Sequence, residues 1–98
     1  MPLPSRVTEL AGFDLLLSVA QLGGIGAAAR AHGISQPAAS ARIRQLEARV
    51  GVALVDRTPR GSSLSEAGAL VADWARPVVE AAADLETGIS ALQHARQA

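Results

Sequence analysis

The sequence has no cysteine, no lysine and only two aromatic residues, Phe13 and Trp74. The lack of cysteine excludes disulfide bonds and thiolate metal sites. Because aromatics are scarce and alanine supplies much of the 49% apolar content, closely packed helices suit the composition better than a β-sandwich. No stretch approaches the ~18 uninterrupted apolar residues of a membrane span, and residues 1–10 lack a signal-peptide pattern. We therefore expect one mostly α-helical domain that is soluble and cytoplasmic.

The formal net charge is zero, but the charges are distributed unevenly along the chain. Residues 1–63 hold seven arginines against four carboxylates, whereas residues 64–98 hold two arginines against five carboxylates. Arginine suits forked recognition of phosphates and guanine edges, although a preference for GC-rich codons would produce the same excess of arginine. The first part of the chain is thus the part whose charge would attract a polyanion.

A first helix is predicted after Thr8, which can cap it through its hydroxyl. Its apolar residues recur at steps of three and four until Gly23 and Gly24, as a buried helix face requires. This predicted core stripe consists of Leu10, Phe13, Leu17 and Ala20.

Residues 24–47 have the pattern of two helices joined by a tight turn. The first of them is short, from about Ile25 to Ala31, and Gly33 permits the left-handed backbone that ends a helix. We interpret His32 as a turn residue rather than a metal ligand, because no second ligand lies at metal spacing.

The next helix is predicted to begin after Ser35, which can cap it, and to end at Val50 before Gly51. Its buried stripe is Ala39, Ile43, Leu46 and Val50. The other positions of the helix leave a polar, partly basic face free: Gln36, Pro37, Ser40, Ala41, Arg42, Arg44 and Arg49. A simpler interpretation of this face is a solvated surface with an ion pair between Arg44 and Glu47.

Residues 54–57 form a short β-prone run, residues 59–61 are typical of a type I turn, and residues 63–64 can return as a second strand. This pattern predicts a small hairpin, or wing. An ordinary surface loop is the alternative.

From Ser65 to about Arg96 a helical pattern of about 30 residues predicts a rod of roughly 45 Å, with a kink near Trp74 caused by Pro77. So long a helix cannot bury its own apolar stripe against so small a domain, which predicts a homodimer. The expected dimer seam is Val71, Trp74, Val78, Ala82, Leu85 and Ile89. We therefore divide the chain into a domain that contains the helix pair and the wing, residues 1–64, and a linker and dimerisation helix, residues 65–98.

Residues 35–68, SQPAASARIRQLEARVGVALVDRTPRGSSLSEAG, resemble the DNA-binding region of LysR-type transcriptional regulators. The matching segments, in the family's order, are 35–38, 43–47, 50–54, 56–58 and 65–68. The resemblance covers about residues 8–95. It implies a winged helix-turn-helix of three helices and a two-stranded wing, followed by a long linker helix. It also implies a dimer that places two recognition helices in successive major grooves of an imperfect inverted repeat.

Carried over by position, the resemblance assigns Gln36, Pro37 and Ser40 to base edges and the wing arginines Arg57 and Arg60 to the minor groove and the phosphates. Side-chain chemistry agrees, since Gln can pair with adenine and Pro can touch a thymine methyl. Ser35, Arg42 and Arg44 are then expected at phosphates on the groove walls. The expected partners are double-stranded DNA and a second copy of the chain, with a higher oligomer in a full-length protein, and neither membrane, metal nor cofactor is expected.

The chain departs from the family pattern at three places. Gly24-Ile25-Gly26 replaces a frequent Ser-Phe-Thr at the start of the second helix, Ala41 replaces a frequent Arg, and His32 replaces a frequent Leu. These changes keep one alternative function open, a protein-interaction or dimerisation module with weak or lost DNA binding.

No catalytic constellation or phosphate-binding loop is present, so we do not expect an enzyme. Relatives usually continue into an effector-binding domain, which we do not expect in this chain, so it is either part of a longer protein or a naturally short homologue. A bacterial, nucleoid-associated protein is the resulting expectation.

Overall fold

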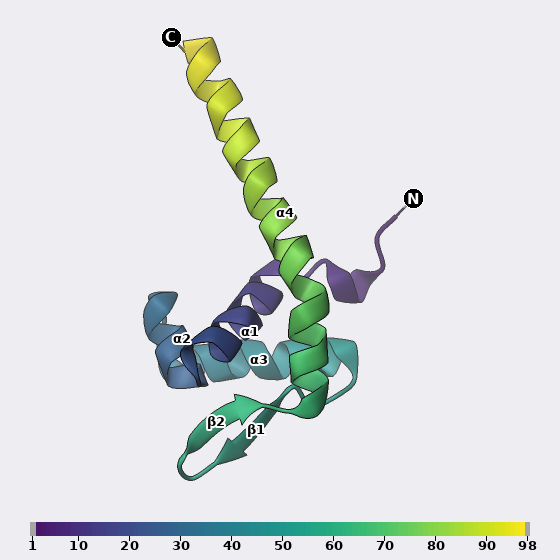
Figure 1. Cartoon of the computed structure of the whole chain (residues 1–98), viewed down its shortest axis with the longest axis vertical. Helices are drawn as coiled ribbons and strands as arrows, with labels where there is room; N and C mark the ends of the chain where they lie inside the picture. The colour runs from purple at the N-terminus through teal and green to yellow at the C-terminus, as the bar shows by residue number, and fades with distance from the viewer. Residues whose placement is uncertain (1, 98) are drawn as a thin grey trace.

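A computed structural model describes residues 2–97 of the chain. The element order is a 3-10 turn η1 (Ser5–Val7), helices α1 (Leu10–Leu22), α2 (Ile25–Ala31) and α3 (Gln36–Val50), strands β1 (Val55–Thr58) and β2 (Gly61–Leu64), and helix α4 (Glu66–Gln97). Figure 1 shows α1, α2 and α3 gathered into one body, with the β1–β2 hairpin at one end and α4 rising from the other side. The predicted fold class, three helices plus a two-stranded wing and a long helix, is confirmed.

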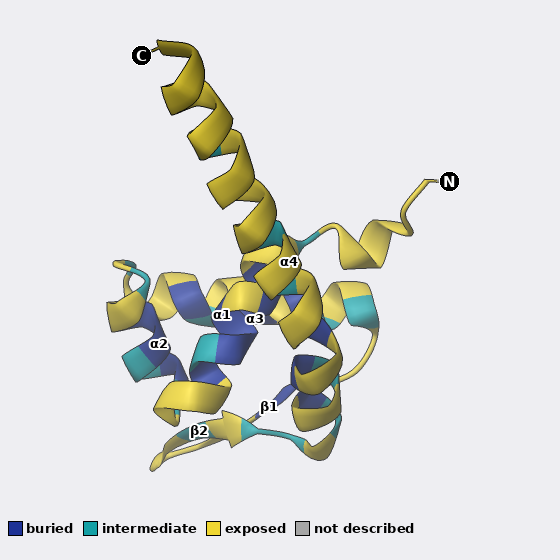
Figure 2. Ribbon diagram, turned by 45° about the horizontal axis from the view of Figure 1, so that its top comes forward, coloured by how far each residue is buried: buried dark blue, intermediate teal, exposed yellow. Residues whose placement is uncertain are grey.

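Helix α1 lies at the centre of the body and packs against α2, α3 and α4. Because it has neighbours on several sides, consecutive residues from Leu15 to Leu17 are all buried, which a single stripe does not predict. The expected stripe is therefore partly wrong: Phe13 and Leu17 are buried, but Leu10 is 36% exposed and Ala20 is exposed. Figure 2 shows the buried residues concentrated where α1, α2 and α3 meet.

The start of α1 also differs from the prediction. Thr8 does not cap this helix, since its hydroxyl donates to the carbonyl of Ser5 at 2.8 Å and closes η1 instead. Glu9 precedes the first helical residue and makes no capping hydrogen bond through its side chain. The hydroxyl is thus used one turn earlier than the sequence pattern indicated.

The turn between α2 and α3 forms as expected. Gly33 has a φ of 67°, in the left-handed region that glycine enters without strain. Ser35 caps α3 by accepting the Ala38 N–H at 3.2 Å, and α3 ends at Val50 before Gly51. His32 lies at this turn as expected, and its Nε2 lies 2.7 Å from the Ser18 hydroxyl and links the end of α2 to α1.

The wing is a two-stranded antiparallel hairpin in which Thr58 pairs with Gly61, so Pro59 and Arg60 form its tip. The Glu47 carboxylate fastens its base to α3 by accepting the N–H groups of Leu54 and Val55 at 2.8 and 3.2 Å. The predicted wing is therefore confirmed, and its base is held by the Glu47 side chain of α3.

Helix α4 begins against the base of the wing and then leaves the body. Ser65 caps it by accepting the Gly68 N–H at 2.9 Å, and the Ser65 hydroxyl donates to the Ala53 carbonyl at 2.8 Å. Small residues on its first turns, Gly68, Ala72 and Ala75, are buried. The helix runs through Pro77 without a break, and Figure 1 shows its axis changing direction before the exposed outer part.

Within residues 2–97, no single helix combines the length and apolarity needed to cross a bilayer. Helices α1 and α2 reach that level only when counted as a pair, and they meet at 117°. The apolar side chains of this pair, such as Leu16 and Ile25, are buried in the core of the body.

Candidate nucleic-acid interface

The first turns of α3 form an exposed polar edge. Gln36 and Pro37 are exposed and Ser40 is half-buried, while Ala39 between them is buried in the core. The three residues expected at base edges therefore lie on one accessible side of α3, as the helical spacing predicted. The Ser35 hydroxyl accepts the Ala38 amide at 3.2 Å, so its acceptor function serves the helix, and its O–H remains available to donate.

A groove of about 520 Å³ lies between the start of α2, the start of α3 and the wing. It brings together Gln36 and Ser40 of α3 with Arg57 of the wing, three residues that the sequence analysis assigned to DNA. Arg30 at the end of α2 also lines it. No carboxylate is among the described residues that line the groove, so its charged groups are the two guanidinium groups, as a phosphate backbone would require.

The arginines of α3 lie in different surroundings. Arg44 is exposed on the helix, whereas Arg42 lies at a shallow hollow beside Glu9 and Gly12 of the α1 region, away from the wing groove. Arg49 makes an ion pair with Glu9, with a nitrogen–oxygen distance of 3.3 Å. The alternative pair between Arg44 and Glu47 is wrong, because the Glu47 carboxylate faces the base of the wing.

The two wing arginines also differ. Arg57 NH1 lies 3.5 Å from Glu47 Oε1, and the Arg57 side chain is 31% exposed, so the wing arginine is oriented by an acid of α3. Arg60 is exposed at the tip of the hairpin. One wing arginine is therefore held toward the groove and the other extends beyond it.

Three residues that matter to this surface were missed from the sequence. Arg30 was counted only as a charge, Glu47 only as a motif residue and as a partner of Arg44, and Ser62 was given no role. Ser62 accepts the Ile25 N–H at 2.9 Å and links the wing to the start of α2. Two consecutive glycines before α2, with no local side chain to cap it, were the only available signal.

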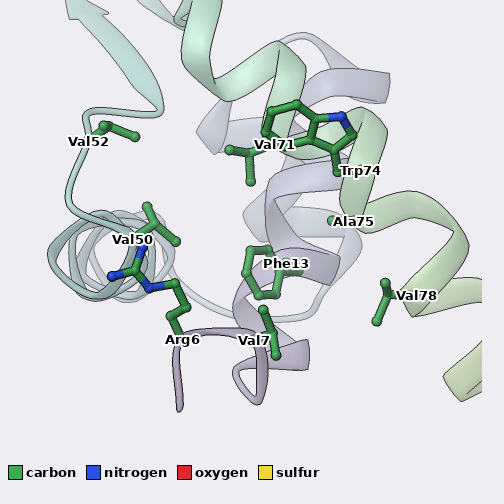
Figure 3. Close-up of a pocket in the computed structure, with 9 residues that line it drawn as sticks. All are labelled: Arg6, Val7, Phe13, Val50, Val52, Val71, Trp74, Ala75 and Val78. Atoms are coloured by element: carbon green, nitrogen blue, oxygen red, sulfur yellow. The ribbon is translucent and has the colours of Figure 1, made fainter. Parts of the chain in front are cut away.

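The expected dimer seam forms a second surface. Trp74 is 69% exposed, Leu85 is 65% exposed and Val71 is half-buried. Near the body this stripe borders an apolar groove of about 370 Å³, in which Phe13 of α1 and Val50 of α3 face Val71, Trp74 and Val78 of α4, as Figure 3 shows. Val71 packs against the core, whereas the outer part of the stripe is largely exposed among residues 2–97 of one protomer.

A helix pair with a tight turn, an exposed second helix, and a hairpin beside it define the winged helix-turn-helix class. The family model for bacterial regulatory helix-turn-helix proteins of the lysR family matches residues 10–69. The chain belongs to the LysR family of bacterial transcriptional regulators.

Relatives of known sequence and structure resemble this chain over most of its length. An uncharacterised HTH-type transcriptional regulator of Mycobacterium bovis is 43% identical over 93 residues, which are 95% of this chain and 30% of that protein. The crystal structure of the CbnR DNA-binding domain in complex with DNA has a TM-score of 0.75 and 32% identity, covering 87% of this chain and 98% of that one. Full-length CbnR with its target DNA also has a TM-score of 0.75 and 32% identity, over 85% of this chain and 29% of that one. The present chain thus spans about a third of the length of its full-length relatives.

Proposed function

We propose that this chain is the sequence-specific DNA-binding part of a LysR-type transcriptional regulator and binds an imperfect inverted repeat as a dimer. The observation that carries the proposal is the groove in which Gln36 and Ser40 of α3 lie beside Arg30 and Arg57 with no lining carboxylate. Similarity to a DNA-binding domain crystallised on DNA supports it. A basic groove beside an exposed helix edge is what entry into a major groove requires.

The exposed edge of α3 supplies the base contacts. Gln36 can present its amide to adenine, Pro37 can touch a thymine methyl, and Ser40 can reach either a base or a phosphate. Because Ala41 replaces a frequent Arg, the middle of this edge has no guanidinium group that could bind guanine through two hydrogen bonds. The specificity then depends on a small number of short side chains together with the shape of the duplex.

The phosphate contacts surround that edge. Arg44 and Ser35 are placed for one groove wall, and Arg57 and Arg60 for the backbone or minor groove under the wing. Arg42 lies on the far side of α3 and would contact the other wall. Arg30 joins this set because it lines the same groove as Gln36.

Two copies would be joined along α4. The proposed seam is the stripe formed by Val71, Trp74, Val78, Ala82, Leu85 and Ile89, of which Val71 and Ala82 are half-buried and the others exposed. Residues 1–64 and 65–98 act as the DNA-reading domain and the linker respectively. A full-length regulator could assemble such dimers into a higher oligomer. This role places the chain at the nucleoid of a bacterial cytoplasm and involves no catalysis.

Fluorescence anisotropy of labelled duplex DNA at two salt concentrations tests the proposal. Affinity should fall steeply as salt rises, because each arginine–phosphate contact releases counterions. Negligible binding at both salt concentrations would instead identify an interaction module without DNA binding. Selecting bound duplexes from a random pool first supplies the preferred half-site and its spacing.

Variants of α3 separate the two kinds of contact. Gln36→Ala and Ser40→Ala should change the preferred sequence, at a cost of about 1–3 kcal/mol on the preferred site. Arg44→Ala should weaken all sequences about equally and reduce the salt dependence by about one phosphate contact. Arg96→Ala, which removes the same charge at the far end of α4, is the control. Equal affinity of all four variants for the preferred site would refute the assigned face.

A further inference from the structure

Helix α2 begins without a cap from its own sequence. Gly24 precedes its first residue and makes no side-chain hydrogen bond, and Gly23 offers none either. The first N–H groups of a helix have no partner within the helix, so they need one from elsewhere. Here the Ile25 N–H donates to the hydroxyl of Ser62 at 2.9 Å, a residue 37 positions later in the chain.

This bond joins the two walls of the groove. Ser62 lies on β2 directly opposite Arg57 on β1, and both residues line the groove together with Gly24 and Ile25. Paired residues of an antiparallel hairpin place their side chains on the same face. A bond that fixes Ser62 therefore also fixes the strand position that carries Arg57.

Apart from the 3.5 Å contact between the Arg57 side chain and Glu47, the other attachments of the wing lie at its base. Glu47 bonds to residues 54 and 55, and Ser65 bonds to the carbonyl of Ala53. A hairpin held mainly at its base can pivot, whereas a hydrogen bond nearer the tip restrains that motion. Ser62 is placed for this restraint, because only residues 59–61 separate it from Thr58.

We propose that Ser62 is a positioning residue that ties the wing to the first turn of α2 and so sets the width of the groove that receives DNA. The inference rests on the DNA-binding function proposed above. It explains how the chain compensates for the Gly24-Ile25-Gly26 segment: the wing supplies a hydroxyl acceptor to the first N–H of α2, whereas a local Ser or Thr cap would accept the second or third N–H. The start of α2 and the wing then move as one unit.

Ser62→Ala tests the tie, with Ser63→Ala as the matched control. Ser63 is an exposed neighbour on β2, paired with Asp56, and its side chain lies on the other face of the hairpin. Ser62→Ala should lower the affinity for the preferred duplex roughly fivefold and the melting temperature by roughly 4–8 °C, as the loss of one hydrogen bond predicts. Ser63→Ala should change neither.

A second substitution distinguishes positioning from helix capping. Gly24→Ser has room for its side chain, with the nearest atom 3.4 Å from the new Cβ, and places a hydroxyl where it can cap α2 locally. In the Ser62→Ala background it should restore the melting temperature but leave the DNA affinity low. Recovery of both would show that Ser62 is only a cap and would overturn the proposal.

Backbone NMR measures the effect of the hydrogen bond between Ile25 and Ser62 without DNA, so its outcome is independent of the proposed function. Ser62→Ala should speed hydrogen exchange of the Ile25 amide and lower the order parameters of the Arg60 and Gly61 amides, whereas Ser63→Ala should not. Unchanged exchange and unchanged wing order would overturn the tie even if DNA binding is confirmed. If Ser62→Ala produces these NMR effects but the parent chain does not bind DNA, the role of the Ile25–Ser62 bond stands and the proposed function is refuted.

Discussion

Glu47 holds the wing through several bonds at once. Its carboxylate accepts the N–H groups of Leu54 and Val55 and lies 3.5 Å from the Arg57 guanidinium, while the Glu47 side chain is only 15% exposed. Bonds to a charged acceptor stabilise more than neutral ones, and their loss would leave two amides without partners. Glu47 of α3 thus fixes the position at which the hairpin begins.

We expect Glu47→Ala to lower the free energy of unfolding by about 1.5–3 kcal/mol, because the two amide bonds lose their charged acceptor. Urea unfolding followed by circular dichroism measures this change. Glu80→Ala, which removes an exposed carboxylate from α4, should change the stability by less than about 0.5 kcal/mol. A loss of equal size in both variants would contradict the role assigned to Glu47.

At Gly68 the backbone of α4 passes close to the segment that enters the wing. A Cβ added there would collide with the backbone carbonyl of Leu54, which is not free to move aside. We expect Gly68→Ala to destabilise the protein by about 1–3 kcal/mol, because either α4 or the wing must shift.

Gly88→Ala is the matched control in the same helix. A Cβ at Gly88 meets open space, so this variant should stabilise the protein by about 0.5–1 kcal/mol through the better helix propensity of alanine. Thermal unfolding of the two variants should therefore shift in opposite directions. Shifts of the same sign would contradict the close approach at Gly68.

The helices of this fold could be predicted where local chemistry marks their ends. Ser35 with Pro37 opened α3 and Gly51 closed it, and the structure has the same bounds. Periodicity failed for α1, because a helix packed on several sides buries more than one stripe, and Leu10 and Ala20 lie outside the buried part. Sequence spacing describes one face, whereas burial depends on how many neighbours the helix has.

The candidate site could be predicted only for the residues that lie on one element. The exposed edge of α3 followed from helical spacing, but the hydrogen-bond partners of Glu47 and Ser62, and the residues that share the groove with Arg30, lie on other elements. No periodicity within the chain encodes a bond between residues 25 and 62. These contacts exist because tertiary packing brings the wing against α2, so they required the structure.

The stripe on α4 gives a prediction about assembly. Leu85→Glu places a charge within the proposed seam and should convert a dimer of twice the chain mass into a monomer at micromolar concentration. Ala83→Glu adds the same charge on the opposite side of the helix and should leave the dimer intact. Light scattering coupled to size-exclusion chromatography measures the mass. A parent chain that is already monomeric at this concentration would refute the seam.

In the molecule as a whole, the two oppositely charged parts of the chain lie in different places. The arginine-rich part forms the body and the wing, while the acidic part forms α4, which extends the molecule to 53 Å along its longest axis. Figure 2 shows that the outer part of α4 is exposed almost throughout. A duplex bound at the wing groove would therefore meet positive charge, with the acidic helix directed elsewhere.

The small residues at the foot of α4 have a mechanical consequence. Gly68, Ala72 and Ala75 are buried and bring the helix backbone close to its neighbours, and α1, against which α4 packs, also contacts α3. Because these side chains are short, the contact between α4 and the body is closely packed and rigid. A change in the tilt of the outer part of α4 is therefore transmitted to the body. In a dimer joined along the two α4 helices, the angle between these helices therefore sets the distance between the two wings.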